Sequence, residues 1–279
     1  MSGRRRSDSA PARSDRALIL RRHAYGESSL VVHALGPGSG RLELLARGAY
    51  RPTSRFAFAL DLFDTLEWTW QPRKGGLDLL VAADLRVRRR RLTQALDAYR
   101  VGLAMLELVD LGTRPGTPEP ALFARLEGAL DELDEGVATG ELPGPALLRF
   151  DAGVLADLGL EPAWRHCASC GRGAPRAKQG ELGRFAAAAG GRLCRPCAER
   201  WEVEGRRCAT ADASVFDLGS QLIEADPASI RGAAREARAA LRRLLDEFLT
   251  WHLERPPKSR SRWRLGERGA SPHPVHAER

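Results

Sequence analysis

The sequence has 279 residues, a net charge of +8 and a pI of about 9.8. No apolar run approaches the roughly 20 residues that a membrane-spanning helix requires, and residues 1–15, a predicted disordered basic tail, lead into no signal-peptide core. The composition therefore argues against a membrane protein and predicts a cytoplasmic chain of two or three modules.

Charge is distributed unevenly along the chain. Residues 16–91 contain 14 Lys or Arg against 7 Asp or Glu, residues 92–160 contain 4 against 12, and residues 161–208 contain 10 against 5. Two basic segments therefore flank an acidic one. Basic surfaces often bind a phosphate backbone, although an ordinary solvated surface produces part of the same pattern. The charge pattern favours a nucleic-acid partner.

Residues 16–91 read as short strands separated by turns, without a 3.6-residue period. The five predicted strands are 17–22, 30–35, 41–47, 62–70 and 77–87. Gly-rich and Pro-containing turns at 36–40 and 72–76 predict hairpins. Five strands in about 75 residues suit a small barrel, for which the oligonucleotide-binding (OB) fold is one candidate.

A basic and aromatic stretch follows the third predicted strand. Arg47, Arg51 and Arg55 recur every four residues, and Tyr50 and Phe56 are interleaved with them. A groove that tolerates any single-stranded sequence needs guanidinium groups and stacking rings. The alternative is a charged barrel rim whose aromatic rings belong to the core. The predicted DNA-binding residues are Arg21, Arg22, Arg41, Arg47, Tyr50, Arg51, Arg55, Lys74, Arg88 and Arg89.

Two further features of the barrel segment have a structural interpretation. Trp68 and Trp70 share one face of a predicted strand and are expected in the core. Four consecutive arginines, 88–91, follow the last predicted strand. They are equally consistent with a solvated linker and with a phosphate contact.

Apolar residues recur every three or four positions from Leu92 onward, which predicts a helical domain. Its first part spans 92–160 and its second part spans 209–255, with a metal module inserted between them. Residues 256–279 are rich in Pro, Ser and Arg and are predicted to form a flexible basic tail. Two charged groups are interpreted as solvated helix faces: Asp131, Glu132, Asp134 and Glu135, and Arg231, Arg235, Arg238 and Arg242.

Two Cys-x-x-Cys pairs lie in segment 161–208: Cys167 with Cys170, and Cys194 with Cys197. Such pairs can bring four thiolates into the tetrahedral geometry of a closed zinc site. Two disulfides would need an oxidising compartment, and a redox pair would need a βαβ context that is missing here. The sequence predicts one structural Zn2+. Four thiolates leave no open position for catalysis.

Two other possible ligands accompany these cysteines. His166 and Cys208 lack the paired spacing of the four, so both are expected to lie outside the ligand set.

The order of these features resembles the RecO family of recombination mediators, bacterial proteins of recombinational DNA repair. Tyr25-Gly26-Glu27-Ser28-Ser29 resembles the family's early signature, and Ala46-Arg47-Gly48-Ala49 resembles its basic turn. The zinc segment matches in order at Leu158-Gly159-Leu160, Pro162, Cys167, Cys170-Gly171, Phe185, Gly190-Gly191, Leu193-Cys194 and Cys197. The late Leu253 and Lys258-Ser259-Arg260 resemble the family's terminus.

The resemblance implies a multidomain α+β protein with an N-terminal OB-fold barrel and a helical domain that carries an inserted four-cysteine zinc finger. It also implies binding of single- and double-stranded DNA, strand annealing, and loading of RecA together with RecR onto strands coated by single-strand-binding protein, in the bacterial nucleoid. The family's binding role carries over best to Arg47 and Arg51. Tyr50 and Thr53 stand where members more often have basic residues, which implies a weaker groove.

The first hypothesis is a non-enzymatic DNA-binding mediator, because the sequence contains no HExxH, P-loop, GxGxxG or GxSxG motif. Two alternatives stay open. One is a zinc-ribbon enzyme that modifies or cleaves nucleic acid with metal ligands from the acidic segment. The other is an adaptor that only binds proteins.

Overall fold

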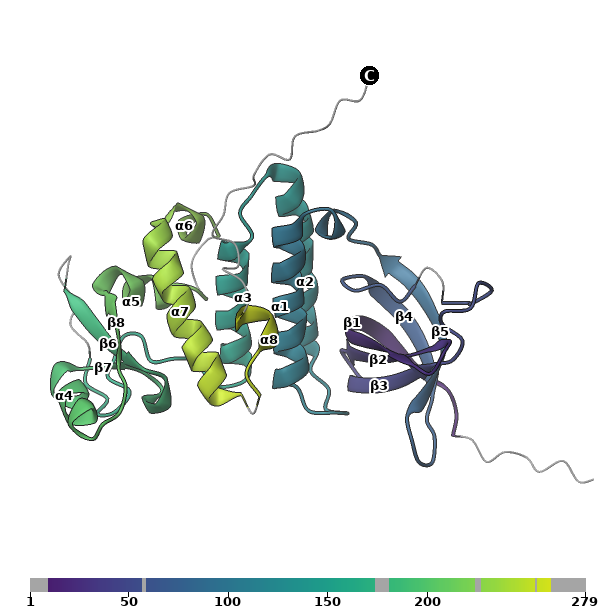
Figure 1. Cartoon of the computed structure of the whole chain (residues 1–279), viewed down its shortest axis with the longest axis horizontal. Helices are drawn as coiled ribbons and strands as arrows, with labels where there is room; N and C mark the ends of the chain where they lie inside the picture. Colours follow the sequence, from purple (N-terminus) through teal and green to yellow (C-terminus); the bar gives the residue numbers. More distant parts are fainter. Residues whose placement is uncertain (1–9, 57–58, 174–180, 224–226, 254, 262–279) are drawn as a thin grey trace, which may run out of the picture. The chain divides into compact units, whose positions relative to one another are not determined.

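The computed structural model describes residues 10–56, 59–173, 181–223, 227–253 and 255–261. The chain divides into two compact units. The first comprises Met1–Gln94 and Met105–Asp134, and the second comprises Ala95–Ala104 and Glu135–Arg279. The first unit contains the barrel, and the second contains the cysteine-bearing module and the C-terminal helices (Figure 1).

Five strands form the closed barrel of the first unit, in the order β1-β2-β3-β5-β4. They are β1 (Arg13–Tyr25), β2 (Ser29–Gly36), β3 (Gly40–Ala46), β4 (Thr65–Gln71) and β5 (Asp78–Val87). The pairing of β3 with β5 is parallel, and the other pairings are antiparallel. A five-stranded barrel of this kind is an OB-like fold, which confirms the predicted architecture.

Strand β1 closes the barrel because it pairs with two neighbours. Its first half, from Arg13 to Leu18, pairs with β4, and its second half, from Leu18 to Tyr25, pairs with β2. The register shifts between Ile19 and Arg21. A bulge of this type bends a strand and increases its twist, so one continuous strand can turn the corner of the barrel.

The barrel core contains the aromatic residues expected there. Trp68 and Trp70 are 1% and 4% exposed, and their ring centroids lie 5.7 Å apart. Phe56 is also buried in this core, whereas Tyr50 is 58% exposed. The core interpretation is therefore confirmed for both tryptophans and for Phe56, and Tyr50 remains at the surface.

Two long helices, α1 (Leu96–Gly112) and α2 (Pro120–Thr139), contribute residues to the first unit. Arg89 is only 2% exposed, and its Nε lies 2.7 Å from Asp131 Oδ1 on α2. Asp134 is 8% exposed; it accepts a hydrogen bond from the Leu92 backbone and pairs with Arg91 at 2.9 Å. The interpretation of this acidic cluster as a solvated face is therefore wrong for Asp134.

The second unit contains α3 (Gly144–Asp157), α5 (Ala213–Gly219), α6 (Pro227–Gly232), α7 (Arg235–His252) and α8 (Lys258–Ser261) outside the cysteine-bearing module. Buried ion pairs connect α3, α7 and α8. Asp151 of α3 is fully buried and accepts hydrogen bonds from Arg242 at 2.8 Å and from Arg260 at 2.6 and 2.7 Å. An ionised carboxylate at such a site needs charged partners.

These pairs correct two predictions. The sequence pattern places Arg242 on a solvated stripe, yet this residue is only 9% exposed. The composition places Arg260 in a flexible tail, 256–279, yet this residue is 7% exposed and lies in α8. The remainder of that tail, from 262 onward, lies outside the described residues.

The cysteine-bearing module is built on a small sheet in the order β7-β6-β8. Its elements are β6 (Leu182–Ala186), the short helix η2 (Ala187–Ala189), β7 (Gly191–Leu193), α4 (Arg195–Val203) and β8 (Ala209–Asp212). Among the described helices of the whole chain, none is both long enough and apolar enough to cross a membrane.

Candidate nucleic-acid interface and metal centre

A pocket of about 510 Å³ opens on the barrel where three loop regions meet. Tyr25 ends β1 and Ser28 lies in the β1–β2 turn, Arg47 and Arg51 come from the turn after β3, and Arg73 comes from the β4–β5 loop. OB folds bind oligonucleotides with strands β2 and β3 and with the β1–β2 and β4–β5 loops. The pocket, called the barrel groove below, therefore lies at the binding position of this fold.

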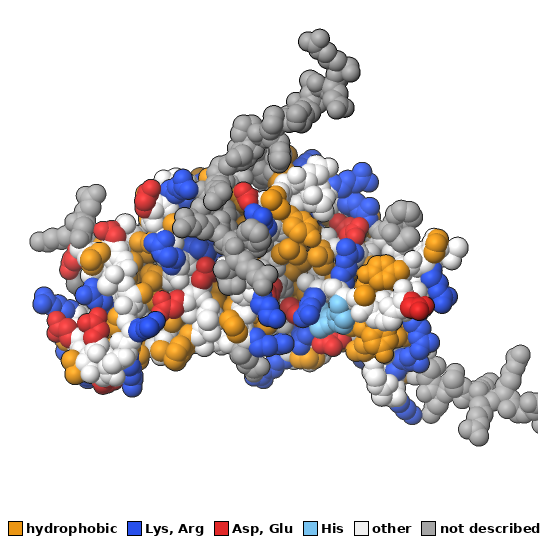
Figure 2. All heavy atoms as spheres, viewed as in Figure 1, with side chains coloured by type: hydrophobic (Ala, Val, Ile, Leu, Met, Phe, Trp, Pro, Cys, Tyr) orange, Lys and Arg blue, Asp and Glu red, His pale blue; other side chains and the backbone are white. Residues whose placement is uncertain are grey.

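The barrel groove combines positive charge with one exposed aromatic ring. Arg47, Arg51 and Arg73 are exposed, and no carboxylate of the described chain lies within ion-pair distance of their guanidinium groups. Tyr25 lines the groove and is 57% exposed. Figure 2 shows Lys and Arg side chains, in blue, over the barrel at the right of the view. Free guanidinium groups and open rings are what a single strand requires.

Glycine makes one wall of this groove possible. Gly48 has a φ of +67°, and a Cβ built there would lie 3.2 Å from Arg51 Cδ. The backbone N–H of Gly48 also donates to Ser29 Oγ at 3.3 Å. The residue therefore supplies a left-handed turn and leaves space for the Arg51 side chain.

The ten predicted DNA-binding residues do not all lie together. Arg47 and Arg51 line the groove; Lys74 follows Arg73 in the same exposed loop. Tyr50 and Arg21 are exposed but do not line it.

The remaining five predicted residues have partners within the barrel unit. Arg22 pairs with Asp61, Arg55 donates to the Val81 carbonyl, Arg41 pairs with Asp110 and Glu43, Arg88 pairs with Asp64, and Arg89 pairs with Asp131. Arg89 is a correction, because its buried guanidinium also donates to the Phe63 carbonyl at 2.6 Å. It holds the barrel to α2 and is not available to phosphate.

Two groove residues were missed by the sequence reasoning. Tyr25 was noted only as part of a signature, and Arg73 only as part of a turn. The available signal was the position of both residues in loops flanking strands of a predicted OB barrel, where that fold binds its ligand.

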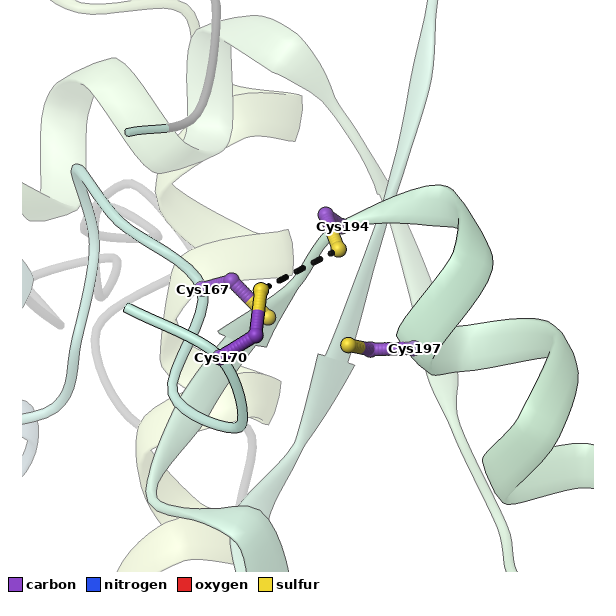
Figure 3. Close-up of side chains that lie close together, drawn as sticks. All are labelled: Cys167, Cys170, Cys194 and Cys197. Atoms are coloured by element: carbon purple, nitrogen blue, oxygen red, sulfur yellow. Dashed lines mark hydrogen bonds between the residues drawn. The ribbon is translucent and has the colours of Figure 1, made fainter. Parts of the chain in front are cut away.

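The four paired cysteines meet at the edge of the small sheet. Cys167 and Cys170 lie in the loop after α3, where Gly171, with a φ of +73°, closes the turn by donating to the Cys167 carbonyl at 2.9 Å. Cys194 caps the start of α4, and Cys197 lies in its first turn. Figure 3 shows the four sulfurs gathered between this loop and the helix.

The sulfur positions fit a metal ion. All four Sγ atoms lie within 4.8 Å of one another, and the Cys170 and Cys194 sulfurs are 3.8 Å apart. Four sulfurs placed 2.3 Å from a central ion at tetrahedral angles lie about 3.8 Å apart, whereas a disulfide joins sulfurs at about 2.05 Å. The cluster can therefore hold one ion.

The surroundings shift the pKa values of two of these thiols in opposite directions. Burial disfavours the Cys167 thiolate, but backbone N–H groups of Cys194, Cys170 and Ser169 outweigh this and lower its pKa to about 6. For Cys194, the backbone N–H of Cys197 favours the thiolate, whereas burial and hydrogen bonds with the other sulfurs raise the pKa to about 12. A bound cation would stabilise all the thiolates together.

Neither of the two additional candidates joins this cluster. His166 is exposed and pairs through its backbone with Gly173, and Cys208 packs at the edge of the module core. In the described part of the chain, the four cysteines are the only such group of possible metal ligands.

The two cysteine pairs are joined through a close backbone approach. Gly191 has a φ of +140°, and a Cβ there would lie 2.6 Å from the backbone N and O atoms of Ala163. Arg192 in turn donates to the Ala163 carbonyl and accepts from the Ala168 N–H, both at 2.8 Å. Only glycine allows this contact, which fixes the Cys167 loop against β7.

The chain matches two family models, described as Recombination protein O N terminal, over residues 12–88, and Recombination protein O C terminal, over residues 93–261. Similar curated proteins are named DNA repair protein RecO. The one from Myxococcus xanthus is 35% identical over 246 residues, which cover 88% of this chain and 94% of the relative. The one from Nocardioides sp. is 32% identical over 247 residues, covering 88% and 96%.

Proposed function

Because this chain belongs to the RecO family of DNA repair proteins, we propose that it is a non-catalytic mediator that binds single- and double-stranded DNA and anneals complementary strands. In this proposal the barrel groove binds the phosphates and bases of one strand. The cation-rich surface screens the repulsion between two strands, so that pairing needs no covalent chemistry and no ATP.

The barrel groove is the observation that carries this proposal. Arg47, Arg51 and Arg73 provide guanidinium groups without described carboxylate partners, and Tyr25 provides an exposed ring beside them. Their position corresponds to the oligonucleotide site of OB folds. A combination of basic groups with a stacking platform supports binding that does not depend on sequence.

We further propose that the four-cysteine cluster holds one structural Zn2+. Cys167, Cys170, Cys194 and Cys197 form a closed all-thiolate shell, which suits zinc and leaves no position for substrate. Such an ion would hold the loop before β6 to the start of α4. Its contribution in this proposal is to the folding of the module.

The proposed partners follow from family membership. They are RecR, single-strand-binding protein and, indirectly, RecA, at DNA in the bacterial cytoplasm. The enzyme alternative relied on metal ligands from the acidic segment of α2, but Asp131 pairs with Arg89 and Asp134 pairs with Arg91. No observation favours that alternative.

The proposal is tested by measuring affinity for a labelled single-stranded oligonucleotide over a range of salt concentrations. The double variant R47A/R51A should bind more weakly, and the slope of log affinity against log salt should fall by about two phosphate contacts. The matched control R90A/R114A removes two exposed arginines that do not line the groove. An unchanged slope in R47A/R51A would exclude this groove.

An annealing assay tests the activity itself. Complementary strands, bare or coated with single-strand-binding protein, should pair faster with the wild-type chain in the absence of ATP, and R47A/R51A should reduce that acceleration. A chain that binds no DNA even at low salt would favour the adaptor alternative. Magnesium-dependent turnover of an oligonucleotide would favour the enzyme.

A further inference from the structure

A second pocket, of about 560 Å³, lies in the second unit. Its lining comes from η2, from α4 and the loop that follows it, and from the end of α7. We call it the tryptophan pocket, because Trp201 and Trp251 line it together with Ala187, Arg206, Arg207 and Glu247. A pocket of a few hundred Å³ is of the size that binds small organic groups.

The two tryptophan rings differ in their surroundings. Arg206 stacks on Trp201, with its guanidinium carbon 4.4 Å from the ring centroid. Trp251 instead leaves 63% of its surface exposed, although it is among the largest apolar side chains of the chain. An exposed indole in a pocket is a free stacking platform.

The end of α7 that carries Trp251 is held in place. The neighbouring His252 contacts the Ala187 carbonyl through Nε2 at 3.1 Å, and its ring centroid lies 4.1 Å from that of Phe248 in the core. These contacts of His252 hold the last turn of α7 in place. The fold itself therefore keeps the Trp251 side chain at the surface.

Two charged groups complete the tryptophan pocket. In the part of the chain that the structure describes, neither Arg207 nor Glu247 has an ion-pair partner, and both are exposed. A guanidinium group binds phosphate, and a glutamate accepts hydrogen bonds from the exocyclic amino group of a base. An open ring, an anion-binding group and an acceptor are the three elements that one nucleotide needs.

We propose that the tryptophan pocket binds one unstacked nucleotide of a single DNA strand, with the base on Trp251, its amino edge at Glu247 and its phosphate at Arg207. This inference rests on the proposed function, because it adds a second contact for the strand that the chain binds. It predicts a preference for bases that carry an exocyclic amino group over thymine, which carries none.

An acidic peptide is the other ligand that an aromatic and basic pocket attracts. Glu247 opposes it, because a carboxylate in the pocket lining repels the side-chain carboxylates of such a peptide. The same carboxylate is matched by the amino group of cytosine or adenine. The charge arrangement therefore favours a base.

The test uses the full-length zinc-loaded chain and two labelled probes, an oligodeoxycytidine and an oligothymidine of equal length, at low salt. W251A should bind the cytidine strand about 5- to 30-fold more weakly in the R47A/R51A background, since one stacking contact is lost. W251F should retain most of the affinity. E247Q, whose amide offers both a donor and an acceptor, should reduce the preference for the cytidine strand.

The control is V203A, which removes an 88% exposed side chain of α4 outside the pocket lining. Melting temperature and zinc content establish that each variant is folded. Unchanged affinity of W251A in both backgrounds would overturn the inference, whereas an unchanged salt slope of R47A/R51A would overturn only the barrel groove. Binding of an acidic peptide that W251A abolishes, with DNA affinity intact, would also overturn the inference.

Discussion

The backbone N–H of Tyr50 donates a hydrogen bond to the Ser28 carbonyl at 3.0 Å. With the bond from Gly48 to Ser29, it joins the turn after β3 to the turn between β1 and β2. The two sequence signatures, Tyr25–Ser29 and Ala46–Ala49, are therefore linked by hydrogen bonds at the same end of the barrel. Their joint role is to hold Arg47 on the wall of the barrel groove.

Gly48→Ala should weaken DNA binding by moving a neighbouring arginine. Alanine at a φ of +67° costs about 1 kcal/mol, and its methyl group would lie 3.2 Å from Arg51 Cδ. We expect a small fall in melting temperature and a several-fold loss of affinity, measured by fluorescence anisotropy. Gly116→Ala is the control, because that φ is +69° and nothing lies within 4 Å. Equal losses of affinity in both variants would contradict this explanation.

Tyr25→Ala should lower affinity without lowering stability. Tyr25 lines the groove and is 57% exposed, and a stacking ring is worth about 1–3 kcal/mol per base. Phe56→Ala should do the reverse, because that ring is 5% exposed and a core Phe→Ala change costs about 3–5 kcal/mol of stability. Chemical denaturation and anisotropy measured on both variants separate the two roles. A stability loss in Tyr25→Ala equal to that of Phe56→Ala would refute the assignment.

The strand pattern could be predicted because one face of each strand is buried, which produces alternation in the sequence. The ends of the strands could not. Strand β1 runs from Arg13 to Tyr25, whereas the apolar pattern covers only 17–22, since its polar ends are held by pairing with β4 and β2. Hydrogen bonding between strands that are distant in sequence does not change the local sequence pattern, so the ends of such strands cannot be predicted from it.

The same limit applies to the arginines. Arg47 and Arg89 are chemically identical, and both follow a strand of the barrel. Arg89 is buried because Asp131, 42 residues later, faces it from α2. Arg47 has no such partner in the described chain. The four cysteines were identifiable because the Cys-x-x-Cys spacing is local within each pair. The cysteine cluster could therefore be predicted from sequence, and the groove only in part.

Arg89→Ala should destabilise the chain but leave the salt dependence of DNA binding unchanged. The substitution removes donors to Asp131, to the Phe63 carbonyl and to Thr65. The Phe63 carbonyl and the Thr65 hydroxyl lose a buried donor, which costs about 1–3 kcal/mol for each group left unsatisfied, whereas the half-exposed Asp131 can be solvated. Urea denaturation should show this loss, while the salt slope of the folded variant matches wild type. A reduced slope would instead return Arg89 to the DNA-binding set.

Removal of the proposed zinc ion should unfold the cysteine-bearing module and spare the barrel. Structural zinc contributes about 10–16 kcal/mol in small zinc-binding peptides, far more than the small core around Cys167 and Cys197 can supply. A chelator, or Cys194→Ser, should remove hydrogen-exchange protection from 163–173 and 181–212. The salt slope set by the barrel groove should persist.

Cys208→Ser is the control for that experiment, since Cys208 lies outside the ligand cluster. It should retain one zinc per chain and normal protection. A loss of DNA binding on zinc removal, with the barrel still folded, would place the module in the binding surface.

Arg260→Ala should destabilise the second unit strongly, although the residue lies in a segment whose composition resembles a flexible tail. Arg260 forms a bidentate pair with the fully buried Asp151 and contacts Asp246 at 3.2 Å. Burial alone would lower the pKa of this guanidinium. The attraction of the Asp151 and Asp246 carboxylates is larger than this effect and raises the pKa above its ordinary value. Arg260→Ala leaves Asp151 with Arg242 alone, at a cost of about 3–5 kcal/mol.

Calorimetry of the zinc-loaded chain would measure this cost. The exposed Arg255 provides the control, and Arg255→Ala should melt like wild type because its side chain is not buried. In the double variant R260A/D151N the loss should be smaller than in R260A, since the buried carboxylate that lost one of its two partners is then absent. If R260A melted like R255A, the ion pair would make no net contribution to folding.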